Sequence, residues 1–311
     1  MFEASENIVN QQIILPILDD KDVELFIKRE DLIHPYISGN KYRKLKYNLV
    51  EAKQQKTEVV LTFGGAYSNH IAATAAAGKI KGFKTIGVIR GDELAKDIDG
   101  VLKSNKTLKF AHEQGMQFKF VSREDYRNKT STSFLNELKQ ELGDFYLVPE
   151  GGSNELAVKG CEEILTKGDE KFNYICSAVG TGGTIAGLIN SVNGSQKVIG
   201  FPALKGNFLE GEIEKFSNRN DNWYLETEYH FGGYGKFDEK LIYFINKFKE
   251  NTTVPLDPIY TGKMLYGIMD MISKDKFPRG SKILVIHTGG LQGIEGVNQK
   301  LKRKGINLIQ Q

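Results

Sequence analysis

One short segment of the chain could supply a reactive amine. Residues 38–45 read Ser-Gly-Asn-Lys-Tyr-Arg-Lys-Leu, so Lys41 follows a turn of small and polar residues. Apolar residues recur after it at helical spacing, at Tyr42, Leu45, Leu49 and Ala52, which predicts an amphipathic helix with Lys41 in its first turn. The partial positive charge of a helix N-terminus disfavours an ammonium group and favours a free amine. Lys41 is therefore a candidate for Schiff-base chemistry, although most of the 42 Lys and Arg residues must simply face water.

A second segment could hold an anion. The apolar residues 174–179 lead into Gly180-Thr181-Gly182-Gly183-Thr184, which opens a predicted helix. Glycines let backbone N–H groups approach an anion, the two threonines add hydroxyl donors, and the helix dipole favours negative charge. This pattern is typical of a phosphate cradle, and the alternative is a turn needed only for tight packing. It is not a dinucleotide fingerprint, because Ile185 replaces the last glycine and Phe201 stands where an acidic ribose ligand is expected.

Two further turns follow predicted strands, and ligands gather at such turns in open parallel sheets. Residues 64–70 place Ser68, Asn69 and His70 at a helix start, where N-capping is the ordinary explanation for a serine or asparagine. His287-Thr288-Gly289-Gly290 follows the strand 283–286, and a lone histidine there is ordinarily structural. The sequence contains no His-Glu-x-x-His metal motif, and Glu155 replaces the final glycine that a nucleophile elbow at residues 151–155 requires.

The elements that must position these turns alternate along the chain. Apolar runs predict strands at residues 23–27, 58–63, 85–89, 116–121, 145–148, 174–179, 198–203 and 283–287. Helical spacing predicts one helix that begins near residue 42, one that begins near residue 68 and one that follows the 180–184 turn and ends at residue 189. It predicts further helices at residues 102–114, 133–142, 154–167, 211–216, 237–249, 262–273 and 292–302. Continuous apolar strands indicate parallel sheets covered by helices on both faces. We therefore expect an open α/β architecture with two sheets, and residues 217–236 are either a lid or an insertion.

Composition narrows the classes of function. The 311 residues suffice for two modest domains, and Lys plus Arg exceed Asp plus Glu by only 42 − 39 = 3. We therefore expect no nucleic-acid partner and no membrane-surface patch. Cys161 and Cys176 are too few for a disulfide framework or a four-cysteine zinc site, so we predict reduced, buried thiols and no metal. Residues 1–10 have no signal pattern and no apolar run is long enough to span a membrane, which predicts a cytoplasmic protein.

Several segments occur together in an order that resembles a known family. They are residues 38–45, Gly65-Ala66-Tyr67-Ser68-Asn69-His70, residues 180–184, Asp257-Pro258-Ile259-Tyr260-Thr261-Gly262-Lys263 and residues 287–290. In this combination the chain resembles the fold-type II pyridoxal-phosphate enzymes, specifically the 1-aminocyclopropane-1-carboxylate (ACC) deaminases and D-cysteine desulfhydrases. The resemblance implies a large domain of residues 1–48 and 152–311, a small α/β domain of residues 49–151, a cofactor between them and a homodimer. Ser38 departs from the glycine often found there, which affects only the geometry of the turn.

The resemblance also implies roles for individual residues. Lys41 would hold pyridoxal 5'-phosphate as a Schiff base, Gly180, Thr181, Gly182, Gly183 and Thr184 would hold its phosphate, and Asn69 would bind the ring oxygen. Thr261 would face the ring nitrogen. Ser68 and Tyr260 would contact the substrate or assist proton transfer. Tyr67, Asn69 and His70 would complete the substrate pocket.

Thr261 bears on the choice of reaction. Ring-opening deaminases of the family carry glutamate at this position, and a carboxylate keeps the pyridinium protonated as a strong electron sink. Elimination of a thiolate needs only a transient carbanion, for which a neutral hydroxyl suffices, and His70 also resembles the desulfhydrases. The expected reaction is β-elimination from a small amino acid, with D-cysteine first. ACC deamination is the alternative, and a catalytically silent ligand-binding protein on the same fold is the alternative from another class.

Overall fold

Two sheets organise the computed structural model, which describes residues 8–218 and 221–310. Within these residues the larger sheet has the strand order β1-β2-β10-β7-β8-β9 and the smaller sheet the order β5-β4-β3-β6. The strands are β1 (Asn10–Ile13), β2 (Val23–Lys28), β3 (Val59–Gly64), β4 (Lys84–Arg90), β5 (Gln117–Val121), β6 (Tyr146–Val148), β7 (Tyr174–Val179), β8 (Lys197–Pro202), β9 (Trp223–Leu225) and β10 (Ser281–Ile286).

Parallel pairing dominates both sheets, as the apolar runs predicted. Strand β7 pairs in parallel with β8 and β10, and β3 pairs in parallel with β4 and β6. The predicted architecture of two open parallel α/β sheets is therefore confirmed, with two additions at the edges of the larger sheet, β9, which pairs in parallel with β8, and β1. Strand β1 pairs antiparallel with β2. Strand β1 has the sequence Asn-Gln-Gln-Ile without an apolar run, so hydrophobic periodicity could not predict it.

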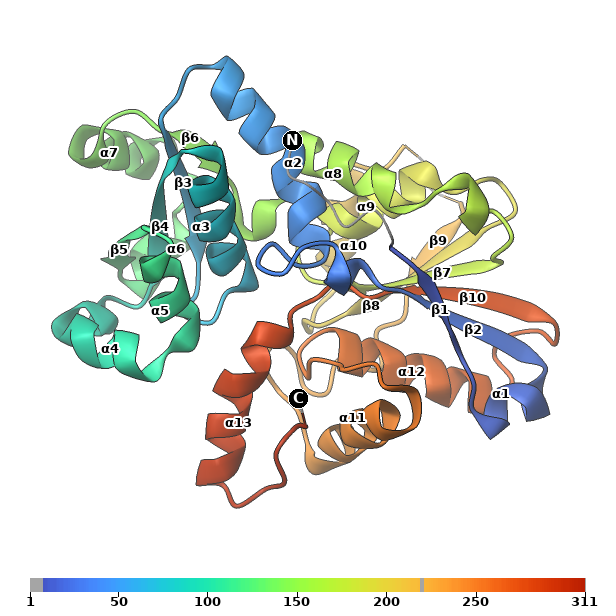
Figure 1. Ribbon diagram of the computed structural model, residues 1–311. Helices are drawn as coiled ribbons and strands as arrows, with labels where there is room; N and C mark the ends of the chain where they lie inside the picture. The colour runs from blue at the N-terminus through green and yellow to red at the C-terminus, as the bar shows by residue number, and fades with distance from the viewer. Residues whose placement is uncertain (1–7, 219–220, 311) are drawn as a thin grey trace.

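Helices cover the faces of the two sheets (Figure 1). They are α1 (Pro16–Lys21), α2 (Asn40–Gln54), α3 (Asn69–Lys81), α4 (Ile98–Ser104), α5 (Lys106–Glu113), α6 (Arg123–Arg127), α7 (Thr132–Leu142), α8 (Glu155–Cys161), α9 (Gly183–Ser191), α10 (Leu209–Glu214), α11 (Glu239–Thr252), α12 (Thr261–Ser273) and α13 (Ile294–Arg303). Helix α3 is buried from His70 to Gly78, because its alanine-rich run lets it pack closely. Both cysteines are free and buried, as predicted.

Two predicted helices are divided in the structure. The expected helix 102–114 is interrupted at Asn105, whose side chain accepts a hydrogen bond from the Leu108 backbone N–H and caps α5. The expected helix 154–167 ends at Cys161 and continues as short 3₁₀ turns. The interruption at Asn105 has a simple cause. An asparagine side chain competes for backbone hydrogen bonds, so it favours the start of a new helix over the interior of an existing one.

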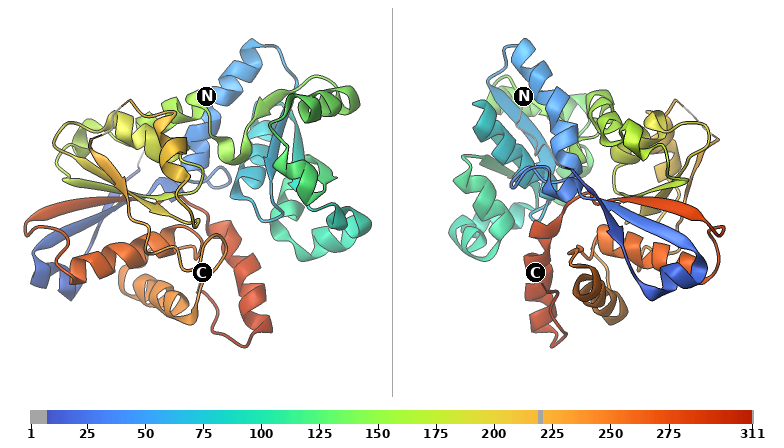
Figure 2. Two further views of the ribbon diagram at one scale, coloured as in Figure 1. Left: turned by 180° about the vertical axis from the view of Figure 1, so that it is seen from behind. Right: turned by 45° about the vertical axis from the view of Figure 1, so that its right-hand side comes forward.

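Helix α2 lies at the junction of the two sheets (Figures 1 and 2). The strands of the smaller sheet come from residues 59–148, and those of the larger sheet come from both sides of this range. The domain boundaries at residues 48 and 151 stay predictions. Residues 1–7 of the large domain and 219–220 of the 217–236 segment lie outside the described residues.

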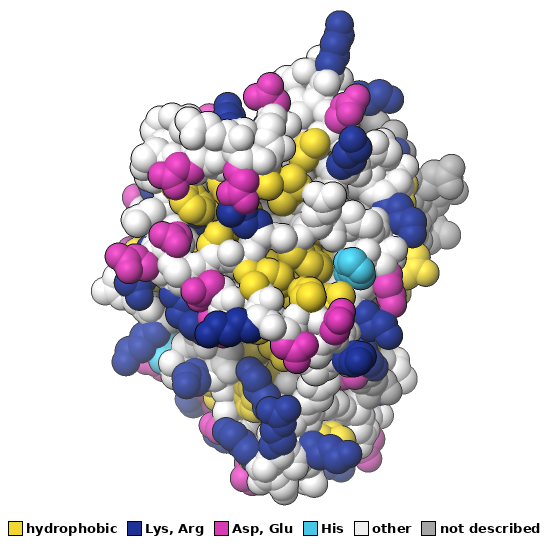
Figure 3. Space-filling model, turned by 90° about the vertical axis from the view of Figure 1, so that its left-hand side faces the viewer, with side chains coloured by type: hydrophobic (Ala, Val, Ile, Leu, Met, Phe, Trp, Pro, Cys, Tyr) yellow, Lys and Arg dark blue, Asp and Glu magenta, His cyan; other side chains and the backbone are white. Residues whose placement is uncertain are grey.

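The surface carries both signs of charge. On the face shown in Figure 3, apolar side chains gather near the middle and are surrounded by acidic and basic residues. Among the described residues, every helix is too short or too polar to cross a membrane.

Candidate active site

The turn before Lys41 is held by backbone contacts. Gly39 precedes α2 with a φ of +60°, and a Cβ there would lie 2.0 Å from the Thr288 carbonyl oxygen, so only glycine fits. The Asn40 N–H donates to that same oxygen at 3.4 Å. Ser38 is compatible with the turn, because Gly39 takes the left-handed conformation and the Ser38 hydroxyl donates to the Asp31 carbonyl. The turn therefore joins α2 to residues 287–290.

Lys41 has the electrostatics of a nucleophile. Burial, helped by the positive charge of Lys44, lowers its pKa from 10.5 to about 7. The sequence pointed to the helix N-terminus as the cause, whereas removal from water is the larger effect here. Lys41 Nζ donates to Asn40 Oδ1 at 3.0 Å, which directs the amine. An appreciable fraction of Lys41 is thus the free amine at neutral pH.

The glycine-threonine loop lies beside this lysine. Residues 180–184 leave the end of β7 and enter α9, with Gly182 in the left-handed conformation as the residue before the helix. Asn40 Nδ2 donates to Thr184 Oγ1 at 2.8 Å. One asparagine side chain therefore contacts both the lysine amine and the loop, and the two segments that the sequence separates by more than 130 residues form one site.

Lys44 adds a cation that the sequence interpretation missed. Its Nζ donates to Ser153 Oγ at 2.9 Å and to the Gly151 carbonyl at 3.1 Å, and it lies 3.4 Å from Thr181 Oγ1. Burial lowers its pKa. The residue is only 2% exposed, so its positive charge is directed at the loop and not at bulk water. Its spacing of three residues from Lys41, on the same face of α2, was the available signal.

Ser68, Asn69 and His70 begin α3, as expected. Ser68 Oγ accepts from the Ile71 N–H at 3.4 Å as an N-cap, so its hydroxyl hydrogen can still be donated to a bound molecule. Asn69 Oδ1 is buried without a hydrogen-bond partner. His70 Nε2 lies 2.8 Å from Thr62 Oγ1, and burial followed by the charges of Lys41 and Lys44 holds its pKa well below 6.5. His70 is therefore neutral beside two lysines.

Asn69 and Asp257 both lie close to Gly290. A Cβ on Gly290 would come within 3.0 Å of Asn69 Nδ2 and 3.5 Å of Asp257 Oδ1. Thr261 is fully buried, and its hydroxyl donates to Asp257 Oδ1 at 2.8 Å while accepting from the Asp257 N–H at 2.9 Å. The hydroxyl hydrogen is thus engaged by a carboxylate, so Thr261 presents an oxygen lone pair to other neighbours.

Tyr260 and Tyr234 form the aromatic side of the site. A Cβ on Gly180 would lie 3.2 Å from the Tyr260 ring, so this ring covers the first residue of the glycine-threonine loop. Burial raises the pKa of Tyr260 well above 10, so its hydroxyl is protonated. The Tyr234 ring packs edge-on to that of Tyr260 with centroids 6.2 Å apart, and the two side chains share a hydrogen bond.

The sequence interpretation also missed Tyr234. This residue belongs to the segment 217–236, which was described only as either a lid or an insertion. It is 54% exposed, although its side chain bonds that of Tyr260. The outer edge of its ring therefore faces solvent.

Tyr67 behaves differently from the other predicted site residues. Its ring packs on Gly296 of α13, with Lys300 5.8 Å above the ring, so its role in substrate binding stays a prediction.

These residues suit pyridoxal phosphate. Lys41 offers an amine for the aldehyde, and the loop with Lys44 offers hydroxyl, backbone and ammonium donors for a phosphate. Asn69 has an unsatisfied buried amide oxygen, which is costly unless a bound group or water meets it.

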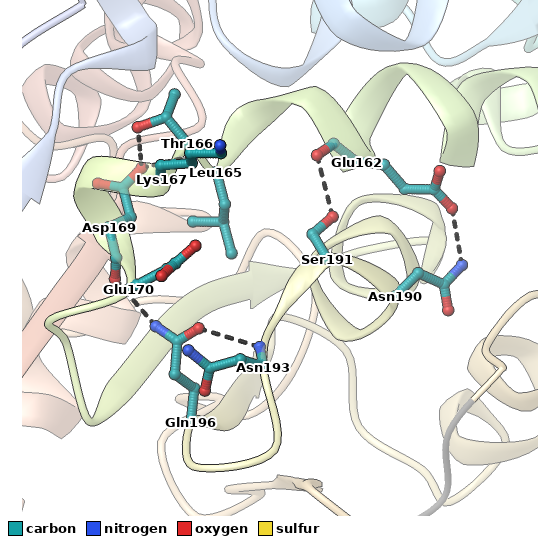
Figure 4. Close-up of a pocket in the computed structure, with 10 residues that line it drawn as sticks. All are labelled: Glu162, Leu165, Thr166, Lys167, Asp169, Glu170, Asn190, Ser191, Asn193 and Gln196. Carbon is teal, nitrogen blue, oxygen red and sulfur yellow. Dashed lines mark hydrogen bonds between the residues drawn. The ribbon is translucent and has the colours of Figure 1, made fainter.

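A separate surface hollow of about 380 Å³ is lined by residues between Glu162 and Gln196 (Figure 4). Several of its polar side chains bond one another or nearby backbone. Asn190 donates to Glu162 Oε1 at 2.9 Å, and Gln196 donates to the Asp169 carbonyl at 2.9 Å. None of the residues that line it belongs to the site around Lys41, so the hollow contributes nothing to that chemistry.

Comparisons with known proteins identify the family of the chain. The family model for pyridoxal-phosphate dependent enzymes matches residues 13–289. The chain is 35% identical to the bifunctional D-cysteine desulfhydrase/ACC deaminase of Arabidopsis thaliana, over 87% of this chain and 73% of that protein. It is 33% identical to a putative ACC deaminase of Pyrococcus horikoshii, over 89% and 88% of the two chains.

A solved structure extends the likeness to the fold. The crystal structure of an ACC deaminase homologue is similar to this chain with a TM-score of 0.78 at 31% identity, covering 97% of this chain and 96% of the other. The chain therefore belongs to the fold-type II pyridoxal-phosphate-dependent enzymes, in the family of ACC deaminases and D-cysteine desulfhydrases.

Proposed function

We propose that the chain binds pyridoxal phosphate through Lys41 and catalyses β-elimination from a small amino acid, with D-cysteine as the preferred substrate. In the overall reaction D-cysteine and water give pyruvate, ammonia and hydrogen sulfide. The observation that carries the proposal is the Asn40 side chain, which bonds both the Lys41 amine at 3.0 Å and Thr184 of the glycine-threonine loop at 2.8 Å. The bound cofactor supplies an aldehyde for the amine and an electron sink for the α-carbon.

The residues of the chain supply binding and proton transfer. Lys44 and the 180–184 loop would bind the phosphate, and the Asn69 amide group would donate to the ring oxygen. The Lys41 amine would accept the α-proton of the substrate, for which a pKa of about 7 is suitable. Ser68 and Tyr260 bind the substrate carboxylate through protonated hydroxyls. Their hydroxyl hydrogens can also protonate the departing thiolate.

Thr261 favours D-cysteine over ACC. Because Thr261 is neutral, no carboxylate in direct contact would keep the ring nitrogen protonated, and the ring would be the weaker electron sink. Elimination of a good leaving group such as thiolate needs a weaker electron sink than opening of the cyclopropane ring does. A second candidate function is ACC deamination to 2-oxobutanoate and ammonia. It is favoured by the names of relatives that are 33% to 35% identical to this chain.

A substrate panel separates the candidates. The purified protein, reconstituted with pyridoxal phosphate, is incubated with D-cysteine, L-cysteine or ACC, and sulfide, pyruvate and 2-oxobutanoate are measured. The proposal expects sulfide and pyruvate in equal amounts from D-cysteine, and none from a Lys41→Ala control. Formation of 2-oxobutanoate from ACC without sulfide from D-cysteine would establish the second candidate. A visible absorption band without turnover of any amino acid would indicate a silent ligand-binding protein.

A further inference from the structure

A buried lysine outside the cofactor-binding set has an unusual pair of partners. Lys263 lies in the first turn of α12, three residues after Tyr260, and is only 2% exposed. Its Nζ donates to the His230 carbonyl at 2.9 Å and to the Gly233 carbonyl at 2.8 Å. Burying an ammonium group is costly unless its hydrogen bonds serve a purpose that an apolar side chain could not.

Both carbonyls belong to the loop that carries Tyr234. We call residues 230–235 the tyrosine loop. Its glycines on either side of Tyr234 have positive φ, at +110° for Gly233 and +69° for Gly235. A segment of this kind has many alternative conformations when it is not fixed. The two hydrogen bonds from Lys263 end at His230, the first residue of the tyrosine loop, and at Gly233, immediately before Tyr234. They therefore restrict the part of the loop that positions the Tyr234 ring.

The charge of Lys263 suits this task at neutral pH. Burial lowers its pKa to about 8, with the nearby Asp257 acting in the opposite direction. The side chain is therefore mostly an ammonium group at pH 7, and hydrogen bonds from a charged donor are about twice as strong as neutral ones. An anchor on α12 also joins Tyr234 to the same helix start that holds Tyr260.

We propose that Lys263 is a positioning residue for the reaction, which acts through Tyr234. By tying the tyrosine loop to α12, it holds the Tyr234 side chain against Tyr260, beside the glycine-threonine loop. The inference rests on the proposed function, since it matters for catalysis only if the two tyrosines face the substrate. Lys263 would then be a residue on which the reaction depends although it contacts neither the cofactor nor the substrate.

The first experiment needs neither cofactor nor turnover. Lys236 is exposed at the end of the tyrosine loop and offers a trypsin site. Lys263→Met should speed cleavage after Lys236 about tenfold or more under native conditions, because the open loop becomes more populated. Lys276→Met, which changes an exposed lysine beyond the same helix, should leave the rate unchanged. Equal cleavage rates in Lys263→Met and the wild-type protein would overturn the proposal.

The second experiment tests the link to Tyr234. In holoenzyme that turns over D-cysteine, Lys263→Met should retain the cofactor absorption band and lose about tenfold to a hundredfold in kcat/KM, a loss typical of small misplacements. Tyr234→Phe should lose a similar factor. The double variant should lose little more than either single variant, because both changes remove one interaction. Fully multiplicative losses would mean that Lys263 acts independently of Tyr234.

A further variant covers failure to fold. Lys263→Gln keeps a donor without the charge, so it should show a smaller increase in cleavage than Lys263→Met and part of its activity. If the melting temperature falls in both variants while their activity per bound cofactor stays at the wild-type value, Lys263 only supports the fold and the proposal is wrong. If neither variant folds, the proposal is also overturned. A wild-type protein without sulfide formation would refute the proposed function, while the cleavage result would still decide whether Lys263 fixes the loop.

Discussion

Asn40 bonds Thr184 across the junction between α2 and α9, with 2.8 Å between Asn40 Nδ2 and Thr184 Oγ1. Its Oδ1 accepts from Lys41 Nζ at 3.0 Å, so one amide fixes the nucleophile relative to the anion-binding loop. Asparagine suits this position because it has a donor and an acceptor on one rigid group. The geometry of the site therefore depends on a residue that takes no part in the chemistry.

Replacing Asn40 by alanine should weaken cofactor binding without unfolding the protein. Loss of two hydrogen bonds in a partly buried position costs about 1–3 kcal/mol, which corresponds to roughly 5- to 150-fold in the dissociation constant of pyridoxal phosphate. The constant is measured by titrating the cofactor-free protein and following absorbance. Asn193→Ala, which changes an asparagine at the hollow of Figure 4, is the matched control. Equal affinities for Asn40→Ala and wild type would contradict this role.

Lys44→Met should distinguish phosphate binding from attachment of the ring. The variant removes the buried cation that contacts Thr181 of the loop. Charge-assisted hydrogen bonds are worth roughly 1.5–3 kcal/mol, so the affinity for pyridoxal phosphate should fall about 10- to 150-fold. Affinity for pyridoxal, which has no phosphate, should change much less. A similar loss for both ligands would mean that Lys44 supports the site in general and does not bind the phosphate.

The cofactor-free protein should react with aldehydes faster as the pH rises. Only the free amine of Lys41 is nucleophilic, and its pKa is about 7. The rate of imine formation with pyridoxal should therefore increase through pH 7 and level off above pH 8. Because the Lys44 charge lowers this pKa, Lys44→Met should move the midpoint upward. A midpoint near the ordinary value of 10.5 would show that Lys41 is not buried as described.

The same pKa has a consequence for stability. Lys41 binds a proton in the unfolded chain up to about pH 10.5 but loses it in the folded protein near pH 7. The unfolded state therefore binds more protons between these values, and the free energy of unfolding should rise with pH in this window. Urea unfolding of cofactor-free wild type and Lys41→Met at pH 6 and pH 8 tests the effect. The wild-type protein should gain more stability over this interval than the variant, and an equal gain would contradict the assigned pKa.

Thr261→Glu should be poorly tolerated on its own. The Thr261 hydroxyl is buried and donates to Asp257, so glutamate would place a second carboxylate beside the first. We expect a loss of about 2–4 kcal/mol in the free energy of unfolding, typical of an unpaired buried charge. Thr261→Gln, similar in size and neutral, should lose less, and adding Asp257→Asn should restore part of the stability of Thr261→Glu. Full stability of Thr261→Glu would show that the two positions are not coupled.

The sequence predicted the parts of the site that depend on local patterns. Lys41 and the 180–184 loop follow from helix spacing and from glycines after an apolar strand, and the order of parallel strands brings such turns to one edge. The predicted roles of Asn69 and Thr261 came from the family resemblance and stay predictions. The N-capping of α3 by Ser68 follows from local chemistry alone.

Other parts depend on contacts that no local pattern records. Lys44 looked like one more basic residue, and only the packing of α2 against residues 151–153 buries its charge. Tyr234 lies in an irregular loop whose path is set by Lys263, far along the chain. The antiparallel strand β1 is polar and short, and it forms because β2 offers an edge. In each case the deciding partner is distant in sequence, so periodicity could not reveal it.

Borohydride reduction followed by peptide mapping tests the central claim most directly. Purified protein with bound pyridoxal phosphate is reduced and digested, and the modified lysine is identified by mass spectrometry. We predict the pyridoxyl group on Lys41, loss of the visible absorption band on reduction, and neither band nor label in Lys41→Ala. A label on Lys44 or another lysine in the wild-type protein, or a band that persists in Lys41→Ala, would contradict the account.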